Sequence, residues 1–218
     1  TFTPWLLQEP STTTTPTVCV TECYSNVLFL PGFEASRLYR PDYNGGTDLL
    51  WEPTSDSDAE DLFLTEQGVS VNNDIHAKDL IDEAYNISLP VFNIYKSFLM
   101  DLNAWKNTEH LIADYSAIPY DWRFAPQDIL LRGTKTGDNI SYIGTSVNPY
   151  IKSELARLVE SSKTGKVTII AHSNGGLIAK MLLKQLEDAN DPLLAKIDTL
   201  ILVATPQVGT PQAMGGLL

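Results

Sequence analysis

Residues 167–176 (Val-Thr-Ile-Ile-Ala-His-Ser-Asn-Gly-Gly) constrain the fold more than any other part of the chain. Strand-like residues 167–170 run into a turn of small residues with Ser173 at its apex, and the apolar, helix-forming segment 177–186 follows. A strand, a tight turn and a helix around a serine form the context of a G-x-S-x-G nucleophile elbow, with Ala171 in place of the first glycine. Ser173 is therefore the candidate nucleophile. The alternative is a chance occurrence of a common pentapeptide.

An elbow also supplies the backbone amide of the next residue, here Asn174, to an oxyanion that develops during attack. Residues 26–32 (Asn-Val-Leu-Phe-Leu-Pro-Gly) predict a buried strand that ends in a tight turn. Ligand-contacting loops lie at the carboxyl ends of strands in open α/β sheets. The amide of Phe33 is thus a candidate second oxyanion donor, unless the turn is an ordinary strand end.

Composition limits the classes of partner. The chain has 218 residues, enough for one domain with its own core, and it is 43% hydrophobic and 19% charged, as in globular proteins. Its net charge is −12, without a cluster of Lys or Arg, which argues against nucleic acid or an anionic membrane as the main partner. No apolar run approaches the ~20 residues of a membrane span. Nothing in the sequence implies a metal or an organic cofactor.

Residues 1–22 are expected to form an exposed tail, with a low-complexity linker at 11–17. Cys19 and Cys23 lack the further Cys or His ligands of a zinc site, so we expect a small disulfide loop, with two free thiols as the alternative. This pattern indicates a secreted or cell-surface protein. The absence of an initiator Met and of a leader favours a mature or trimmed chain.

The remaining pattern predicts the order β-α-β-α-β-α-β, which is that of a mainly parallel sheet with helices on both faces in one α/β domain, residues 23–218. Besides the elbow strand and helix, the expected elements are strands at 26–32, 111–118 and 199–204 and helices at 91–105 and 148–161. Residues 40–107 are polar, acidic and irregular apart from that helix, and we expect a cap-like insert. Residues 133–146 are expected to form a polar loop.

Residues 119–123 (Pro-Tyr-Asp-Trp-Arg) follow the second predicted strand. The four side chains after the proline could form a substrate wall held by an acid–arginine pair. They could equally form a corner packed under the insert, in which the charged pair satisfies loop backbone. Chemistry alone does not separate these readings for Tyr120, Asp121, Trp122 and Arg123.

Four stretches in this order resemble the lecithin:cholesterol acyltransferase-like branch of the α/β-hydrolase lipases. They are residues 30–38 (Leu-Pro-Gly-Phe-Glu-Ala-Ser-Arg-Leu), 119–123, 171–176 and 204–211 (Ala-Thr-Pro-Gln-Val-Gly-Thr-Pro). The resemblance covers residue 26 to the end and implies an acyl-ester hydrolase or acyltransferase with a serine acyl-enzyme. It places Ser173 as nucleophile and the amides of Phe33 and Asn174 in the oxyanion hole, and it puts residues 119–123 near the active-site cleft.

One feature departs from this family. The triad of an α/β-hydrolase runs Ser, Asp or Glu, then His along the chain, but no histidine follows Ser173. His172 is expected to point away from the serine, and His76 and His110 lie upstream. We therefore expect residues 1–218 to be the N-terminal portion of a hydrolase, truncated after the strand that follows the nucleophile helix, with the acid and base on a C-terminal segment or a second chain.

The sequence thus predicts a serine-dependent ester hydrolase of lipase or phospholipase type. Transfer of the acyl group to an alcohol acceptor competes with hydrolysis. A non-catalytic lipid- or glycan-binding module is a second class, favoured by the missing histidine, and an amidase or peptidase on the same scaffold is a third.

Overall fold

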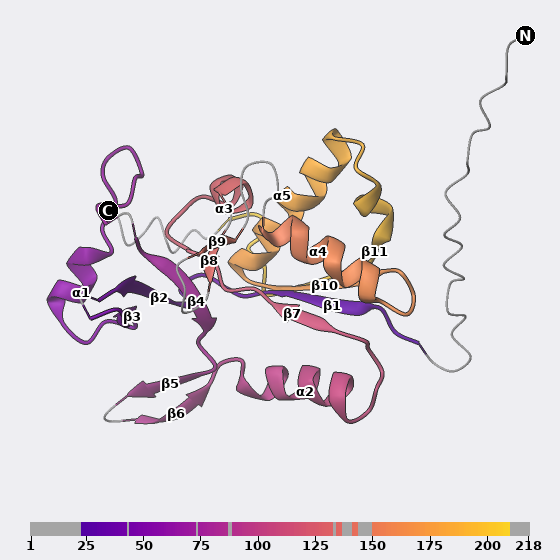
Figure 1. The fold of residues 1–218 in the computed structure, drawn as a ribbon, viewed down its shortest axis with the longest axis horizontal. Coiled ribbons are helices and arrows are strands. Elements are labelled where there is room, and N and C mark those ends of the chain that lie inside the picture. Colours follow the sequence, from indigo (N-terminus) through magenta and orange to yellow (C-terminus); the bar gives the residue numbers. More distant parts are fainter. Residues whose placement is uncertain are drawn as a thin grey trace, which may run out of the picture.

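The structure is a computed structural model that describes residues 23–42, 44–72, 74–86, 89–132, 134–136, 141–143 and 150–209. Its centre is a sheet of four strands in the spatial order β11-β10-β1-β7 (Figure 1). All three neighbouring pairs are parallel, so the predicted parallel sheet is confirmed. The strands are β1 (Asn26–Leu30), β7 (Tyr115–Ala117), β10 (Val167–His172) and β11 (Ile197–Val203).

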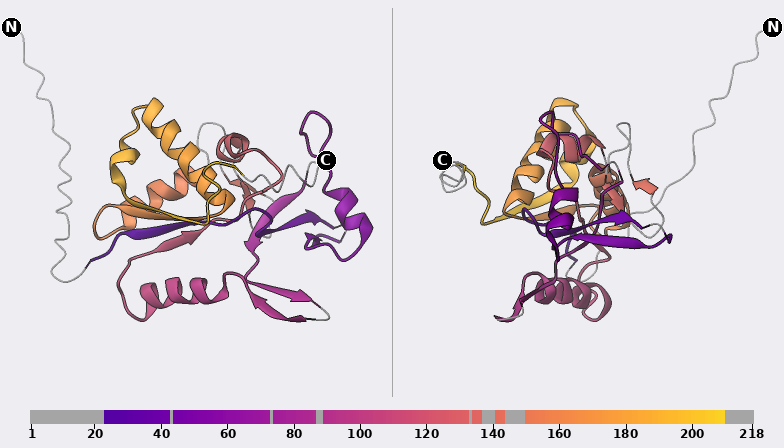
Figure 2. Two further views of the ribbon diagram at one scale, coloured as in Figure 1. Left: turned by 180° about the vertical axis from the view of Figure 1, so that it is seen from behind. Right: turned by 90° about the vertical axis from the view of Figure 1, so that its left-hand side faces the viewer.

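Helices cover both faces of this sheet, as Figures 1 and 2 show. Helix α2 (Lys96–Asn107) lies on one face. The other face carries α3 (Pro126–Arg132), α4 (Tyr150–Ser161) and α5 (Asn174–Asp188). A 3₁₀ helix, η1 (Pro192–Lys196), leads from α5 into β11.

Strand β1 is buried on both faces because it lies between the two helical layers. Leu28 and Leu30 belong to the large core with α4 and α5, whereas Phe29 packs with Tyr95 and Val27 with Leu102 on the α2 side. A continuous apolar run is the expected sequence of such a parallel strand. The predicted buried strand at 26–32 is confirmed at 26–30, and the structure adds that it lies inside the sheet, between β10 and β7.

The expectation of an irregular insert at 40–107 is wrong in its secondary structure. A three-stranded antiparallel sheet of order β3-β2-β4 lies past the carboxyl end of β1 (Figure 1). It consists of β2 (Ser36–Pro41), β3 (Thr47–Trp51) and β4 (His76–Leu80), with the short helix α1 (Asp56–Asp61) after β3. Only a few apolar residues of each strand are buried. The segment is therefore rich in charged and turn-forming residues, and the alternation of apolar and polar residues that predicts a strand is not visible in its sequence.

Two hairpins complete the described chain. Strands β5 (Glu83–Asn86) and β6 (Leu89–Asn93) precede α2, which is why the helix predicted from residue 91 begins at Lys96. Strands β8 (Thr134–Thr136) and β9 (Ser141–Ile143) pair within the segment expected to be a loop. Within the described ranges, no helix has the length and apolar character needed to cross a membrane.

The predicted tail and Cys19 lie outside the described residues. Cys23 is disulfide-bonded, and Cys19 is the other cysteine of the chain. The pairing of these two residues stays a prediction.

Asn26 joins three elements at the start of β1. Its side chain is fully buried and donates to the Leu158 carbonyl (2.9 Å) and the Ser161 hydroxyl (3.0 Å). Its oxygen accepts from the amides of Ala113 (3.0 Å) and Asp114 (2.8 Å). One side chain thus ties the end of α4 to the segment that leads into β7.

We expect Asn26→Ala to lower the free energy of unfolding by about 3 kcal/mol, because it leaves two half-buried amides and one buried carbonyl without their partner. Denaturant titration measures this change. Ser161→Ala, which removes a single partner of Asn26, is the control and should cost under about 1 kcal/mol. Equal losses in the two variants would show that the Asn26 network does not carry the stability assigned to it.

Candidate active site

Ser173 stands in a strained backbone conformation between β10 and α5. Its φ is 49° and its ψ −119°, a region that residues with a Cβ rarely adopt. Its amide donates to the Val203 carbonyl (2.8 Å), and its carbonyl accepts from the Gly176 amide (3.0 Å). These bonds hold a conformation that costs on the order of 1–3 kcal/mol. Such strain is typical of a nucleophile elbow, as the sequence predicts.

The amino end of α5 lies directly against the end of β1. A Cβ on Gly175 would overlap the Leu30 carbonyl and lie 2.5 Å from the Pro31 carbonyl oxygen. Only glycine permits this approach, which explains the second small residue of the motif. The close contact brings the elbow and the turn after β1 to one place.

The turn after β1 presents a free amide beside the serine. A Cβ on Gly32 would lie 3.3 Å from the Ser173 Cβ, so the turn and the elbow are in contact. The Phe33 amide donates no backbone hydrogen bond to any described residue. Asn174 is the first residue of α5, where helical amides have no acceptor in their own helix and the helix dipole favours negative charge. The amides of Phe33 and Asn174 thus belong to two segments that are in contact, and their role as oxyanion donors stays a prediction.

The side chain of Tyr120 forms hydrogen bonds to the turn after β1. It is 0% exposed, and its hydroxyl donates to the Pro31 carbonyl oxygen at 2.8 Å, with the Gly32 carbonyl oxygen 3.2 Å away. The Asn174 side-chain amide in turn donates to the Tyr120 hydroxyl (3.3 Å). Burial raises the pKa of Tyr120 above its ordinary range, so the phenol stays protonated. Because Tyr120 is buried, we expect it to affect the site by fixing the backbone of the turn after β1.

The other residues of the 119–123 corner contact the small sheet. Trp122, 9% exposed, donates from its ring to the Ser36 carbonyl (3.0 Å) and packs edge-on against Phe33 and Trp51. The Arg123 guanidinium pairs with both Asp121 oxygens (2.9 and 2.6 Å). It also donates to the Leu62 carbonyl and the Ser70 hydroxyl. These contacts match the second interpretation, a corner packed under the insert. Phe33, which packs against this corner, is 55% exposed.

Each of the three histidines of the chain has a hydrogen-bond partner other than Ser173. Nδ1 of His172 lies 2.7 Å from the Tyr95 hydroxyl on the α2 side. His76 is buried in the small sheet with Nδ1 3.1 Å from the Asp74 carbonyl. His110 is exposed after α2, with Nδ1 near the Lys106 carbonyl. Among the described residues, none of these histidine hydrogen bonds involves the Ser173 hydroxyl.

Tyr95 is a site residue that the sequence does not indicate. It lies just before α2 and is 7% exposed, and its hydroxyl oxygen accepts from the Gly32 amide (2.9 Å). Tyr95 falls within the helix predicted at 91–105, where it resembles any other apolar position. No local pattern distinguishes it from a core aromatic.

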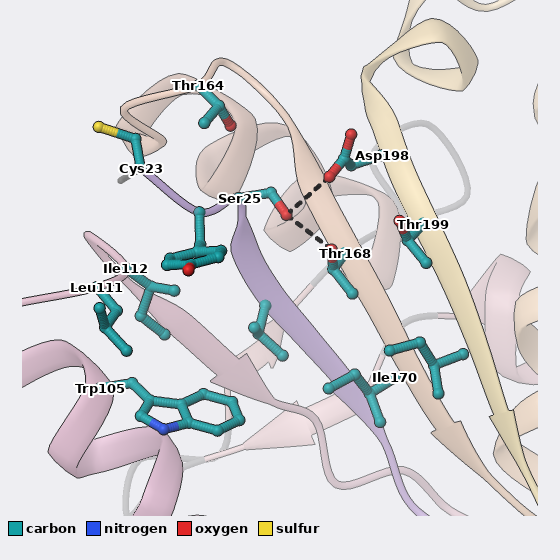
Figure 3. A pocket seen from close by; sticks show the side chains of 13 residues that line it. Cys23, Ser25, Trp105, Leu111, Ile112, Thr164, Thr168, Ile170, Asp198 and Thr199 are labelled. Carbon is teal, nitrogen blue, oxygen red and sulfur yellow. Dashed lines mark hydrogen bonds between the residues drawn. The ribbon is translucent and has the colours of Figure 1, made fainter. Parts of the chain in front are cut away.

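A separate apolar hollow of about 670 Å³ lies on the α2 side, near the amino ends of the strands (Figure 3). Trp105 and Ile170 are part of its wall. At its mouth the Ser25 hydroxyl lies 2.7 Å from the Thr168 hydroxyl and donates to Asp198 (3.4 Å). Ser173 does not line the hollow, and the lining residue of β10 nearest to Ser173 is Ile170, three strand residues or about 10 Å away. This hollow is thus no part of the elbow site.

No group of three or more potential metal-ligating side chains gathers within the described ranges. The polar groups that converge at the elbow are backbone amides, phenols and one imidazole. The phenols and the imidazole are engaged with the backbone or with each other, which leaves the amides of Phe33 and Asn174 as the candidate oxyanion donors.

Replacing Ser173 tests the strain directly. We expect Ser173→Gly to be more stable than Ser173→Ala by about 1 kcal/mol, because glycine adopts this backbone conformation without a clashing Cβ. Both variants lose the hydroxyl, so thermal unfolding compares only the Cβ. An alanine variant as stable as the glycine variant would mean that the elbow is unstrained.

His172 predicts a pH effect on stability. Burial lowers its pKa below the ordinary value of 6.5, so its contribution to folding is fully present above pH 6.5 and is lost as the pH falls through the folded-state pKa. His172→Gln should remove this part of the pH dependence, measured as the free energy of unfolding against pH. His110→Gln, at an exposed histidine, is the control. A wild-type slope retained in His172→Gln would contradict the prediction.

Comparison with known proteins identifies the family. The family model described as lecithin:cholesterol acyltransferase matches residues 62–218, well over half of the chain. The matched range contains the elbow and the 119–123 corner, while β1 and the turn after it precede it. No curated protein and no solved structure matches the chain significantly. The family implies an α/β-hydrolase fold and an enzyme that acts on lipids, with acyltransferase or phospholipase-type activity. The predicted resemblance is confirmed, and the chain belongs to the lecithin:cholesterol acyltransferase family.

Proposed function

We propose that the protein is a serine-dependent carboxylic-ester hydrolase of lipase or phospholipase type that acts through an acyl-enzyme on Ser173. The observation that carries this proposal is the strained Ser173 backbone beside two amides without backbone acceptors in the described chain. Strain of this kind persists only where the surrounding structure enforces it, and it is typical of functional sites.

In the proposed reaction the Ser173 oxygen attacks the ester carbonyl carbon, and its proton passes to a general base. The carbonyl oxygen becomes an oxyanion that accepts hydrogen bonds from the Phe33 and Asn174 amides. Collapse breaks the bond to the alcohol, which leaves with the proton from the base. Water then attacks the acyl-enzyme in the same way and releases the carboxylic acid.

We propose that the acid and base of the triad come from outside residues 1–218, on a C-terminal segment or a second chain. The engagement of all three histidines elsewhere supports this. The order of triad residues in α/β-hydrolases supports it as well.

Two alternatives share this scaffold. Transfer of the acyl group to an alcohol, in place of water, is supported by the family description. A non-catalytic lipid-binding module would keep the fold without a base. The two ordered amides favour an enzyme, because a module that only binds lipid has no use for an oxyanion site.

The disulfide-bonded Cys23 supports an oxidising compartment, hence a secreted or cell-surface protein. The net charge of −12 supports a lipid or other acyl-ester substrate over nucleic acid.

A fluorophosphonate probe tests the nucleophile. We expect the native protein, purified with any partner segment, to acquire the probe on the peptide that contains Ser173, as read by mass spectrometry. Ser173→Ala should lose the label, and Ser116→Ala on β7, the matched control, should retain it. Absence of label in the wild-type protein would overturn the enzymatic proposal in favour of the binding module.

Product analysis separates hydrolysis from transfer. A phosphatidylcholine substrate is offered with and without a long-chain alcohol, and free fatty acid and new ester are quantified. Mostly free acid supports the hydrolase, and mostly new ester supports the acyltransferase.

A further inference from the structure

The hydroxyl of Tyr95 bridges the two halves of the site. It lies 2.9 Å from the Gly32 amide nitrogen, in the turn after β1, and 2.7 Å from Nδ1 of His172, the residue before the nucleophile. The rings of Tyr95 and His172 meet edge to face, with centroids 5.7 Å apart and an interplanar angle of 78°. A single phenol oxygen thus contacts both the oxyanion turn (residues 31–33) and the elbow.

The direction of the two hydrogen bonds follows from the donors present. The Gly32 amide can only donate, so the Tyr95 oxygen accepts that proton. The other hydrogen-bond partner of the Tyr95 hydroxyl among the described residues is Nδ1 of His172, so we assign Nδ1 as the acceptor of the phenol proton, in a neutral imidazole protonated on Nε2. Burial lowers the pKa of His172, which keeps the imidazole neutral and the chain of donors in order.

This chain decides which amide of the oxyanion turn is free. With the Gly32 amide engaged by Tyr95, the next amide, that of Phe33, is left to face a substrate oxygen. Tyr120 holds the Pro31 carbonyl of the same turn (2.8 Å). The turn is therefore fixed by two phenols, one on a carbonyl and one on an amide.

Tyr95 is itself held firmly. The amides of Ile94, Tyr95 and Lys96 all donate to the Asp82 carbonyl (2.9, 3.0 and 3.2 Å). The ring of Tyr95 packs edge-on against Phe29 of β1, with centroids 5.1 Å apart. A group that must orient another needs such support.

We propose that Tyr95 is a positioning residue that holds the oxyanion turn in the orientation that receives the substrate oxygen, with His172 as the acceptor that orients its hydroxyl. This inference rests on the proposed function, because it assigns a role within the same reaction. Tyr95 touches the turn and the elbow and does not itself contact the reacting atoms.

The test is Tyr95→Phe in the native protein, with hydrolysis of p-nitrophenyl butyrate and labelling by a fluorophosphonate as readouts. We expect kcat to fall about 10-fold to 100-fold, less than or equal to the loss of a direct oxyanion donor, with KM nearly unchanged. The second-order rate of fluorophosphonate labelling should fall in parallel, because its phosphoryl oxygen occupies the same site. Tyr39→Phe is the matched control, since it removes a hydroxyl bonded to Asp79 in the small sheet, and it should keep the wild-type rates.

Substitutions of His172 separate positioning from packing. His172→Phe fills the space without accepting a proton, whereas the amide oxygen of His172→Gln can accept it. We expect the phenylalanine variant to lose more kcat than the glutamine variant. Tyr95→Phe combined with His172→Phe should cost less than the product of the two single losses, because both break one chain.

The outcomes are distinct. Wild-type labelling at Ser173 together with an unchanged kcat in Tyr95→Phe overturns this inference and leaves the proposed function standing. An equal loss in Tyr39→Phe, or a rise in KM alone, also overturns it. Failure of the wild-type protein to label overturns both.

Discussion

The close contact between the amino end of α5 and the carboxyl end of β1 is the constraint on which the site depends. It requires Gly175, since any side chain there would meet the Leu30 and Pro31 carbonyls. With the helix this near, the chain has no room for a relaxed turn, and Ser173 takes its positive φ. The same contact brings the first residue of α5 close to the turn that carries Phe33. The strained Ser173 backbone and the nearness of α5 to the turn after β1 are thus both consequences of one close contact.

The 119–123 corner shows how a recognisable motif can serve a site without facing it. Tyr120 holds the turn after β1, Trp122 holds β2 through the Ser36 carbonyl, and Arg123 holds the loop after α1 through the Leu62 carbonyl. Buried pairs such as Arg123 with Asp121 contribute little net stability but fix geometry, because leaving either partner alone is costly. The corner is therefore a bracket between the parallel and antiparallel sheets.

The elbow, the parallel sheet and its two layers of helices could be predicted from sequence because each depends on local runs of residues, whereas the spatial order of the strands was not predicted. Ser173, Phe33 and Asn174 follow from their places at strand and helix ends. The antiparallel sheet could not be predicted because its strands lack a regular alternation of apolar and polar residues. Leu38 and Leu50 are fully buried, but ion-paired side chains such as Arg37 and Arg40 occupy neighbouring positions. Tyr95 was hidden for a different reason: its partners Gly32 and His172 are 63 and 77 residues away. For residues 119–123, chemistry allowed two roles, and only burial distinguishes them.

The carbonyl of Asp82 fixes the point where the β5–β6 hairpin joins α2. Because it binds three successive amides at the start of α2, the β5–β6 hairpin leaves and returns at nearly the same point. Changes in hairpin length or sequence are absorbed before they reach the helix. Evolution could therefore remodel this hairpin while the elbow and the turn after β1 keep their positions.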